Sequence, residues 1–226
     1  MVETHFHQEL EALEVIMMKM FTLTEKSLHQ AVQAMRERDD DLAQAVIEED
    51  KELNRLEVQI EERTLNILAL WQPVARDLRF ITGCSRIAND LERIGDQSTN
   101  IAERALMLNQ KPRHSSMNSV ESLADLAMDM YRSVTSSFSN LDCDVALNVC
   151  KMDSQADDMN IRIMRDLIDF MVNESKLVER AVHTILIANA LERVADLSTN
   201  IGEDVVFIAR GINVKHSNQF DSLCHD

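Results

Sequence analysis

Residues 89–104, NDLERIGDQSTNIAER, decide the fold, because the stretch returns at residues 189–204 as NALERVADLSTNIGED. Ten of the sixteen positions are identical, and each of these ten residues reappears 100 positions later. A match at a fixed offset indicates two copies of one structural unit. We therefore interpret the chain as a tandem duplication.

The repeated stretch has the apolar period of a helix. Seven positions of the first copy are spaced alternately by three and four residues and share one helical face. They are Ile87, Leu91, Ile94, Ser98, Ile101, Ala105 and Leu108. The second copy keeps this pattern at Ile187, Leu191, Val194, Ser198, Ile201, Val205 and Ile208. Both copies are predicted to bury the same face.

Four oxygen-bearing side chains form a second stripe, which we expect to face outward. They are Glu92, Asp96, Asn100 and Glu103, and the second copy keeps all four as Glu192, Asp196, Asn200 and Glu203. Other polar positions differ between the copies. A merely solvated face has no reason to keep both charge and position, since surface changes alter stability by no more than about 0.5 kcal/mol.

A second row of oxygen ligands precedes each of these stripes. In the first repeat it comprises Asp50, Asn54, Glu57 and Glu61, and in the second Asp153, Asp157 and Asn160. Hard cations are bound by carboxylate and amide oxygens, so two such rows on neighbouring helices predict a site for one ion or a small cluster. Two alternatives remain open: Arg93 and Arg193 pair with the acids, or the stripes are simply solvated.

Composition excludes several function classes. The net charge is −16 with a pI near 4.8, and aromatic residues make up 4% of the chain, which argues against nucleic-acid binding. The sequence has no apolar run of membrane-spanning length and no signal-peptide pattern at its start, so we expect a cytoplasmic protein. The four cysteines lack C-x-x-C spacing, so neither a zinc site nor a redox pair is predicted from them.

An all-α fold follows from the scarcity of turn residues. Four glycines and two prolines leave long helices uninterrupted and provide no phosphate-binding glycine loop. Helices are predicted at about 3–38, 41–70, 73–109, 119–138, 144–172 and 175–210, with Pro73 in the first turn of the third. The predicted units are 1–110 and 115–213, followed by a tail at 214–226.

Catalytic residues are not predicted. No histidine follows an acid by three residues, so the Glu-x-x-His signature of di-iron bundles is missing. The sequence also supports no Ser/His/Asp or Cys/His arrangement.

Three motifs together resemble the PhoU family of bacterial phosphate-uptake regulators. They are ERIGD at residues 92–96, ERVAD at 192–196, and QPVARDLR at 72–79, and the resemblance extends over essentially the whole chain. The resemblance implies two similar three-helix bundles, assembled as a homodimer. It also implies multinuclear iron or zinc clusters on the surface, with magnesium or manganese as further candidates.

Matched onto this chain, the metal ligands implied by the resemblance are Asp50, Asn54, Glu92, Asp96 and Asn100 in the first repeat, and Asp153, Asp157, Glu192, Asp196 and Asn200 in the second. Asn54 replaces a carboxylate of the family pattern, so we expect the first site to bind more weakly. Ala195 in place of Gly95 is expected to matter little.

The resemblance further implies a negative regulator of the phosphate-starvation response. It would act between the ATPase subunit of an ABC phosphate transporter and a sensor histidine kinase, meeting the membrane only through these partners. One alternative is a carboxylate-bridged multi-metal hydrolase or oxygenase. Another is a structural helical dimer whose acids bind no metal.

Overall fold

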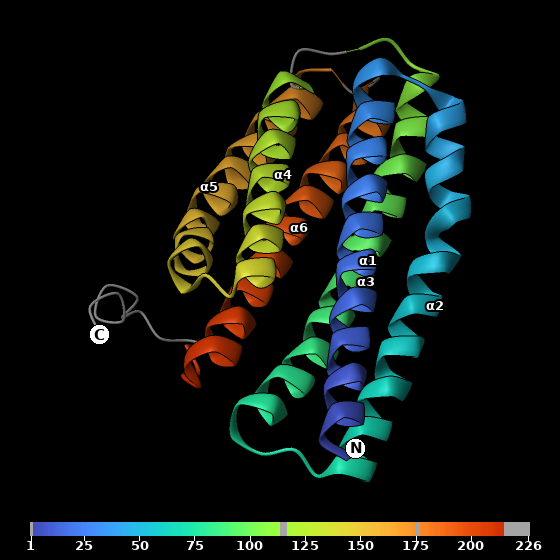
Figure 1. Cartoon of the computed structure of the whole chain (residues 1–226). Helices are drawn as coiled ribbons and strands as arrows, with labels where there is room; N and C mark the ends of the chain where they lie inside the picture. Colours follow the sequence, from blue (N-terminus) through green and yellow to red (C-terminus); the bar gives the residue numbers. More distant parts are fainter. Residues whose placement is uncertain (1, 114–116, 175–176, 215–226) are drawn as a thin grey trace.

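Long helices make up nearly all of the chain in the computed structural model, which describes residues 2–113, 117–174 and 177–214 (Figure 1). The fold is all-α, as the sequence predicts. The helices of the described residues are α1 Val2–Glu37, α2 Asp40–Trp71, α3 Ala75–Asn109, α4 Met117–Asn140, α5 Cys143–Asn173 and α6 Val178–Arg210.

Capping residues explain several of the helix ends. Asp39 precedes α2 and accepts a hydrogen bond from the backbone N–H of Leu42 at 2.9 Å, which makes it the N-cap of this helix. Gly211 ends α6 with φ of 74°, a left-handed conformation that glycine adopts without strain. The prediction for Pro73 was wrong. Pro73 lies in the non-helical connection before Val74, the N-cap of α3.

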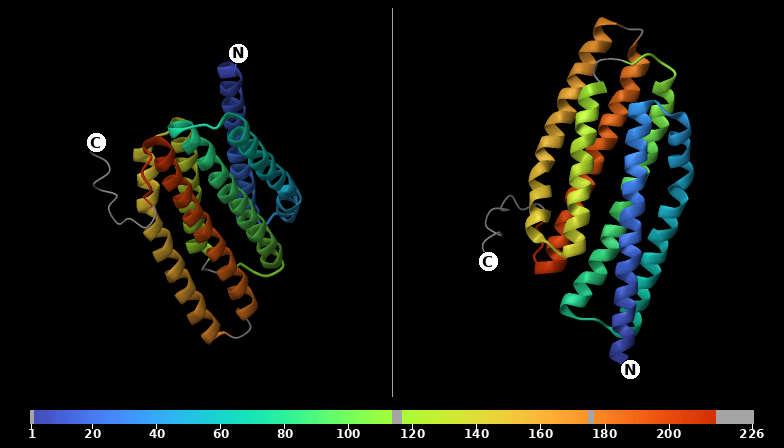
Figure 2. Two further views of the ribbon diagram at one scale, coloured as in Figure 1. Left: turned by 90° about the horizontal axis from the view of Figure 1, so that it is seen from below. Right: turned by 45° about the horizontal axis from the view of Figure 1, so that its top comes forward.

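The helices form a row of four covered by a pair. Figures 1 and 2 show α5, α6, α3 and α2 following one another across the molecule, with α1 and α4 packed over them. The two central helices run antiparallel and approach closely where Gly83 of α3 meets Ile208 of α6. A side chain at position 83 would collide with Ile208, since its Cβ would lie 2.5 Å from two side-chain atoms. A glycine therefore allows α3 and α6 to approach closely at this point.

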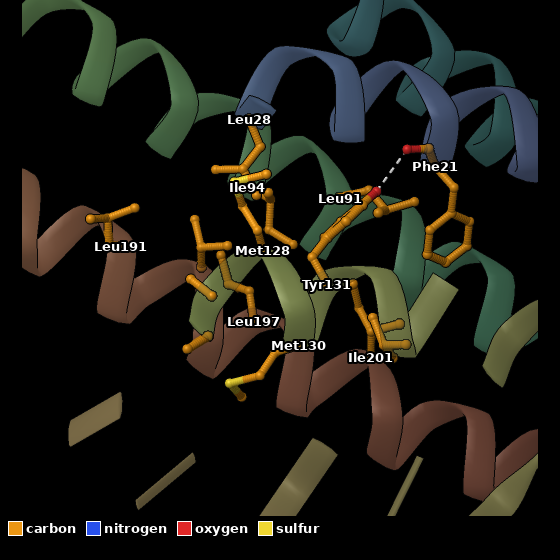
Figure 3. Packing of buried hydrophobic residues seen from close by; sticks show 14 of the residues in the cluster. Phe21, Leu28, Leu91, Ile94, Met128, Met130, Tyr131, Leu191, Leu197 and Ile201 are labelled. Atoms are coloured by element: carbon orange, nitrogen blue, oxygen red, sulfur yellow. Dashed lines mark hydrogen bonds between the residues drawn. The ribbon is translucent and has the colours of Figure 1, made fainter. Parts of the chain in front are cut away.

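One apolar core runs through both repeats. All fourteen positions of the two predicted stripes are buried except Leu108, which is half-buried. In Figure 3, Tyr131 of α4 reaches α1, where its hydroxyl donates a hydrogen bond to the carbonyl oxygen of Phe21 at 2.8 Å. Because the repeats share their core, the duplicated units are structurally interdependent.

Two predicted segments reach the limits of the described chain. The helix predicted from residue 175 begins at Val178, with residues 175–176 outside the described part. Val214, the first residue of the predicted tail, is buried, and residues 215–226 are also outside the described part. None of the described helices combines the length and the apolar composition that a membrane-spanning segment needs.

Candidate metal centre

The first carboxylate cluster lies in the groove between α2 and α3. Asp50 of α2 is directed towards Gly95 of α3, where a Cβ at position 95 would lie 3.7 Å from the Oδ1 atom of Asp50. The amide of Asn54, one turn along α2, donates a hydrogen bond to Asp50 Oδ2 at 3.2 Å. Asn54, the residue that departs from the family pattern, therefore orients the carboxylate beside it.

Electrostatics shows that acids of both helices face this groove. Partial burial raises the pKa of Glu92, and the neighbouring carboxylates of Asp96, Glu57 and Asp50 raise it further. Burial and Asp50 likewise raise the pKa of Asp96. Glu92 is half-buried rather than fully outward, and Asp96 is exposed. Sequence reasoning thus placed these acids on the correct face, but it missed that the groove partly desolvates them.

The second cluster lies between α5 and α6 in the corresponding place. Burial raises the pKa of Asp153, as do the carboxylates of Asp157 and Asp196. The pKa of Glu192 is raised by burial, then by Asp157 and Asp196. Asp153 also accepts a hydrogen bond from the hydroxyl of Thr199 at 3.3 Å. Four acids from two helices therefore repel one another in this groove.

The two arginines of the repeated motif behave differently. Arg193 forms an ion pair with Asp196, one turn further along α6. Arg93 is directed to the other side and contacts Asp90 at 3.4 Å. Internal ion pairing, one of the two alternatives, therefore applies to Asp196 of the second cluster. In the first cluster Arg93 still lowers the pKa values of Glu92 and Asp96, but its ion pair is with Asp90.

The predicted amide ligands lie less centrally than the acids. Asn100 is exposed, and its amide donates to Gln97 at 3.4 Å. Asn200 is half-buried at the equivalent position of α6. Asn160 donates to Asn189 at 3.1 Å, which links α5 to α6 beside the second cluster. These amides flank the clusters, whereas the desolvated groups are carboxylates.

The carboxylate and amide oxygens of the clusters are the ligand types that a hard cation prefers, but their side chains do not point to one common position. Asp50 Oδ1 is buried and has no hydrogen-bond partner, a costly state for a carboxylate oxygen that a cation would relieve. Among residues 2–113, 117–174 and 177–214, no three His, Cys, Asp or Glu side chains are placed to hold one ion. Binding would therefore require the carboxylates to turn towards each other, which their mutual repulsion opposes without a cation.

Two further features could not be read from the repeat. Thr199 corresponds to Thr99 in the repeat, and its hydroxyl donates the hydrogen bond to Asp153. Gly95 accommodates Leu53, whose Cδ1 would be 2.5 Å from a Cβ at position 95. At the matching positions the second repeat has Ala156 and Ala195, both smaller than the Leu53 side chain. Glycine at position 95 therefore leaves room for Leu53, and the expectation that Ala195 matters little in the second repeat stays a prediction.

Comparison with known proteins shows a single family. The family model described as the PhoU domain matches residues 17–105 and again residues 120–205. The phosphate-specific transport system accessory protein PhoU homolog of Pseudomonas putida is 36% identical over 218 residues, covering 95% of this chain and 84% of that protein. The phosphate-specific transport system accessory protein PhoU of Escherichia coli K12 is 32% identical over 224 residues, and the match covers 98% of this chain and 93% of that protein.

Solved structures agree with this likeness. PhoU from Pseudomonas aeruginosa matches with a TM-score of 0.89 and 33% identity, covering 92% of this chain and 100% of that one. The phosphate transport system regulatory protein PhoU from Streptococcus pneumoniae matches with a TM-score of 0.86 and 26% identity, covering 92% of this chain and 99% of its own. The tandem three-helix arrangement is therefore shared with experimentally determined structures.

Proposed function

The chain belongs to the PhoU family of phosphate-transport accessory proteins, and from this premise we propose that it is a metal-binding regulatory adaptor of phosphate uptake. It acts in the cytoplasm as a homodimer and represses the phosphate-starvation response. Its partners are the ATPase subunit of an ABC phosphate transporter and a sensor histidine kinase. The family is non-enzymatic, which argues against the multi-metal hydrolase or oxygenase.

One observation carries the metal part of the proposal. Acids kept in both repeats meet in two equivalent interhelical grooves, where burial and mutual repulsion raise the pKa values of Glu92, Asp153 and Glu192. Bringing a divalent cation between such groups removes the repulsion and replaces lost water ligands. Carboxylate-rich sites of this kind accept iron, zinc, manganese or magnesium with different geometries.

Two features of the molecule support an adaptor role. The curated relatives are accessory proteins of a transport system by name. In addition, the protein is strongly acidic and built from long helices, whose outer faces offer extended surfaces for other proteins. Regulation would then be transmitted through contacts whose strength depends on the carboxylate clusters.

Metal content of protein purified without chelator tests the proposal. We expect stoichiometric metal in the wild type. Glu92→Ala/Asp96→Ala should lose the metal of the first cluster, and Glu192→Ala/Asp196→Ala should lose the metal of the second cluster. Glu11→Ala/Glu14→Ala is the matched control, because it removes two exposed acids from α1 away from both grooves. A folded wild type that takes up none of the four metals would refute the ligand assignment.

A genetic test addresses regulation separately. In a host lacking its own family member, we expect the wild-type chain to repress a phosphate-starvation reporter when phosphate is plentiful. The two cluster variants should repress less than Glu11→Ala/Glu14→Ala at equal protein levels. Equal repression by all variants would separate regulation from metal binding.

The second candidate function is a structural dimer whose acids bind no metal, and the ion pair of Arg193 with Asp196 favours it. The Arg193 ion pair already neutralises part of the charge on Asp196. If this pairing is the purpose of the arginine, Arg193→Ala should destabilise the protein without raising its metal affinity. On the metal proposal, the same variant frees Asp196 and raises metal affinity at the second cluster.

A further inference from the structure

Two equivalent threonines lie beside the carboxylate clusters but form different hydrogen bonds. Helical serine and threonine hydroxyls often donate to the carbonyl oxygen one turn earlier, as Ser98 does to Ile94 at 2.9 Å. Thr199 instead donates across the second groove, between α5 and α6, to Asp153 Oδ1 at 3.3 Å. Thr99 is its counterpart in the first repeat, and its Oγ1 atom is buried without a hydrogen-bond partner among the described residues.

The aspartate of the first groove, between α2 and α3, is also incompletely bonded. Asp50 corresponds to Asp153, and its Oδ1 atom is buried without a hydrogen-bond partner in the described part of the chain. This oxygen lies 3.7 Å from the place of a Cβ on Gly95. Thr99 follows Gly95 by four residues and therefore shares its face of α3. These two buried polar atoms thus border one groove, at the positions where the second repeat has a hydrogen bond.

One sequence difference explains why the two aspartates are held differently. In α2, the amide of Asn54 donates to Asp50 Oδ2 at 3.2 Å, which holds this carboxylate along its own helix. The matching residue of α5 is Asp157, whose ionised carboxylate has no hydrogen to donate. Asp153 is therefore bound by Thr199 from the opposite helix. An amide or an acid at one position decides which helix orients the aspartate.

We propose that Thr99 is a positioning residue of the first metal cluster, and that its hydroxyl donates to Asp50 in the metal-loaded protein. Leaving buried polar atoms unpaired is costly. A turn of Asp50 away from Asn54 and towards Thr99 pairs both atoms and reproduces the arrangement of Asp153 with Thr199. Carboxylates that bind metals are commonly held by such hydrogen bonds. The first cluster then changes its hydrogen bonds on binding, whereas the second is oriented in advance.

Electrostatic repulsion explains why this turn requires a cation. Burial raises the pKa of Asp96 on α3, and the charge of Asp50 raises it further. Moving Asp50 towards Thr99 brings its charge towards the helix that carries Asp96, which is unfavourable until a cation neutralises the pair. In the second groove, the ion pair of Arg193 with Asp196 reduces the corresponding repulsion. The aspartate there reaches its threonine without such help.

Urea unfolding of chelated protein tests the pairing itself. Thr99→Val keeps the side-chain shape and removes a hydroxyl without a partner among the described residues, so the midpoint should stay the same or rise. Thr199→Val removes an existing hydrogen bond, so the midpoint should fall. Asn54→Asp gives the first groove the acid of the second. In this background, Thr99→Val should lower the midpoint, as Thr199→Val does. Absence of that loss would overturn the pairing of Thr99 with Asp50, whether or not metal binds.

Metal affinity tests the positioning role, which rests on the proposed function. With the second cluster removed by Glu192→Ala/Asp196→Ala, Thr99→Val should weaken binding of Zn²⁺ and Mn²⁺ about 10- to 100-fold, because a ligand loses the group that orients it. Thr99→Ser keeps the hydroxyl and should restore most of the affinity. Thr82→Val is the matched control on α3, since the hydroxyl of Thr82 donates to the carbonyl of Leu78 in its own helix at 2.8 Å. Equilibrium dialysis measures the affinities, and circular dichroism establishes that each variant is folded.

The outcomes distinguish this inference from the proposed metal role. Weaker metal binding by Thr99→Val, together with unchanged or higher stability of the chelated protein, would support the positioning role. A threonine that serves packing alone would not change the two properties in this way. Equal affinities of Thr99→Val and its parent would overturn the inference and leave the metal role intact. A wild type that binds neither ion would overturn the metal role together with the change at Thr99.

Discussion

At the scale of single residues, the half-buried carboxylates make stability depend on pH in an unusual direction. Burial and neighbouring acids raise the pKa of Glu192 above its ordinary 4.5. The folded state then binds this proton more tightly than the unfolded state does. The contribution of Glu192 therefore favours folding below pH 4.5 and is lost as the pH rises through the folded-state pKa.

The substitution Glu192→Gln should accordingly stabilise the metal-free protein at neutral pH. We expect a gain of a few tenths of a kcal/mol, up to about 1 kcal/mol, because solvent screens a half-exposed charge. The gain should vanish below about pH 4, where the carboxyl is protonated in both states. Urea unfolding of chelated protein from about pH 3.5 to about 7.5 measures it, with Glu11→Gln as an exposed control. A constant difference at all pH values would contradict the electrostatic cause.

Gly95 provides a second prediction, which concerns packing. Gly95→Ala should destabilise the protein, although alanine favours helix, because the new Cβ would lie 2.5 Å from Leu53. Leu53→Ala alone should cost about 2–5 kcal/mol, since Leu53 is fully buried. The double variant recreates the Ala156 and Ala195 pair of the second repeat and should be more stable than the sum of the single changes predicts. Denaturant unfolding of all four proteins gives the coupling free energy, and additive effects would refute the compensation.

The internal repeat explains how far the site could be predicted. Comparing the copies identified which oxygen-bearing residues are kept, because two copies under the same constraint act as a control for each other. It could not show that Arg193 contacts Asp196 while Arg93 contacts Asp90. The copies differ three residues before each arginine, Asp90 against Ala190, so only Arg93 has an acid on that side, but the sequence does not show which acidic neighbour each arginine contacts. Whether the acids bind metal remains a prediction for the same reason.

At the scale of helices, a boundary can be predicted where the residue type itself favours ending a helix. Asp39 and Gly211 are residue types that terminate helices in any fold, and both do so here. Pro73 misled because proline suits the first helical turn but also suits an extended connection. Gln72 takes a left-handed conformation as the C-cap of α2, with φ of 47°, which leaves Pro73 outside both helices.

The two helix caps at equivalent positions of the repeats offer a prediction at this scale. Asp39 caps α2 through one backbone N–H, and Asp142 caps α5 through two, those of Asp144 and Val145 at 3.0 and 3.1 Å. Replacing either aspartate with alanine should cost about 0.5–2 kcal/mol, with the larger loss at Asp142. Thermal and urea unfolding measure the loss. Asparagine at the same positions keeps the acceptor oxygen and should retain most of the stability; equal losses for alanine and asparagine would exclude the capping role.

At the scale of the whole molecule, the antiparallel contact of α3 with α6 relates the repeats by an approximate two-fold axis. Near one end of this contact, Arg86 of α3 forms an ion pair with Asp204 of α6 at 3.3 Å and stacks over Phe207. The related end has Leu186 and Arg104 at the equivalent positions. Asp204 is almost fully buried, whereas Arg104 is half-buried. The duplication is therefore symmetric in its fold but not in the chemistry that joins its halves.

This asymmetry leads to a prediction about how the repeats hold together. Arg86→Leu removes a cation from beside buried Asp204 and should destabilise the protein by up to about 3 kcal/mol, since breaking a buried ion pair from one side is costly. Arg86→Leu/Asp204→Arg copies the residue types of the related end, Leu186 and Arg104, so it should recover part of the loss. Urea unfolding followed by circular dichroism measures both variants. A double variant no more stable than Arg86→Leu would show that the two ends of the contact are not interchangeable, and that the ion pair has become specific to its own end.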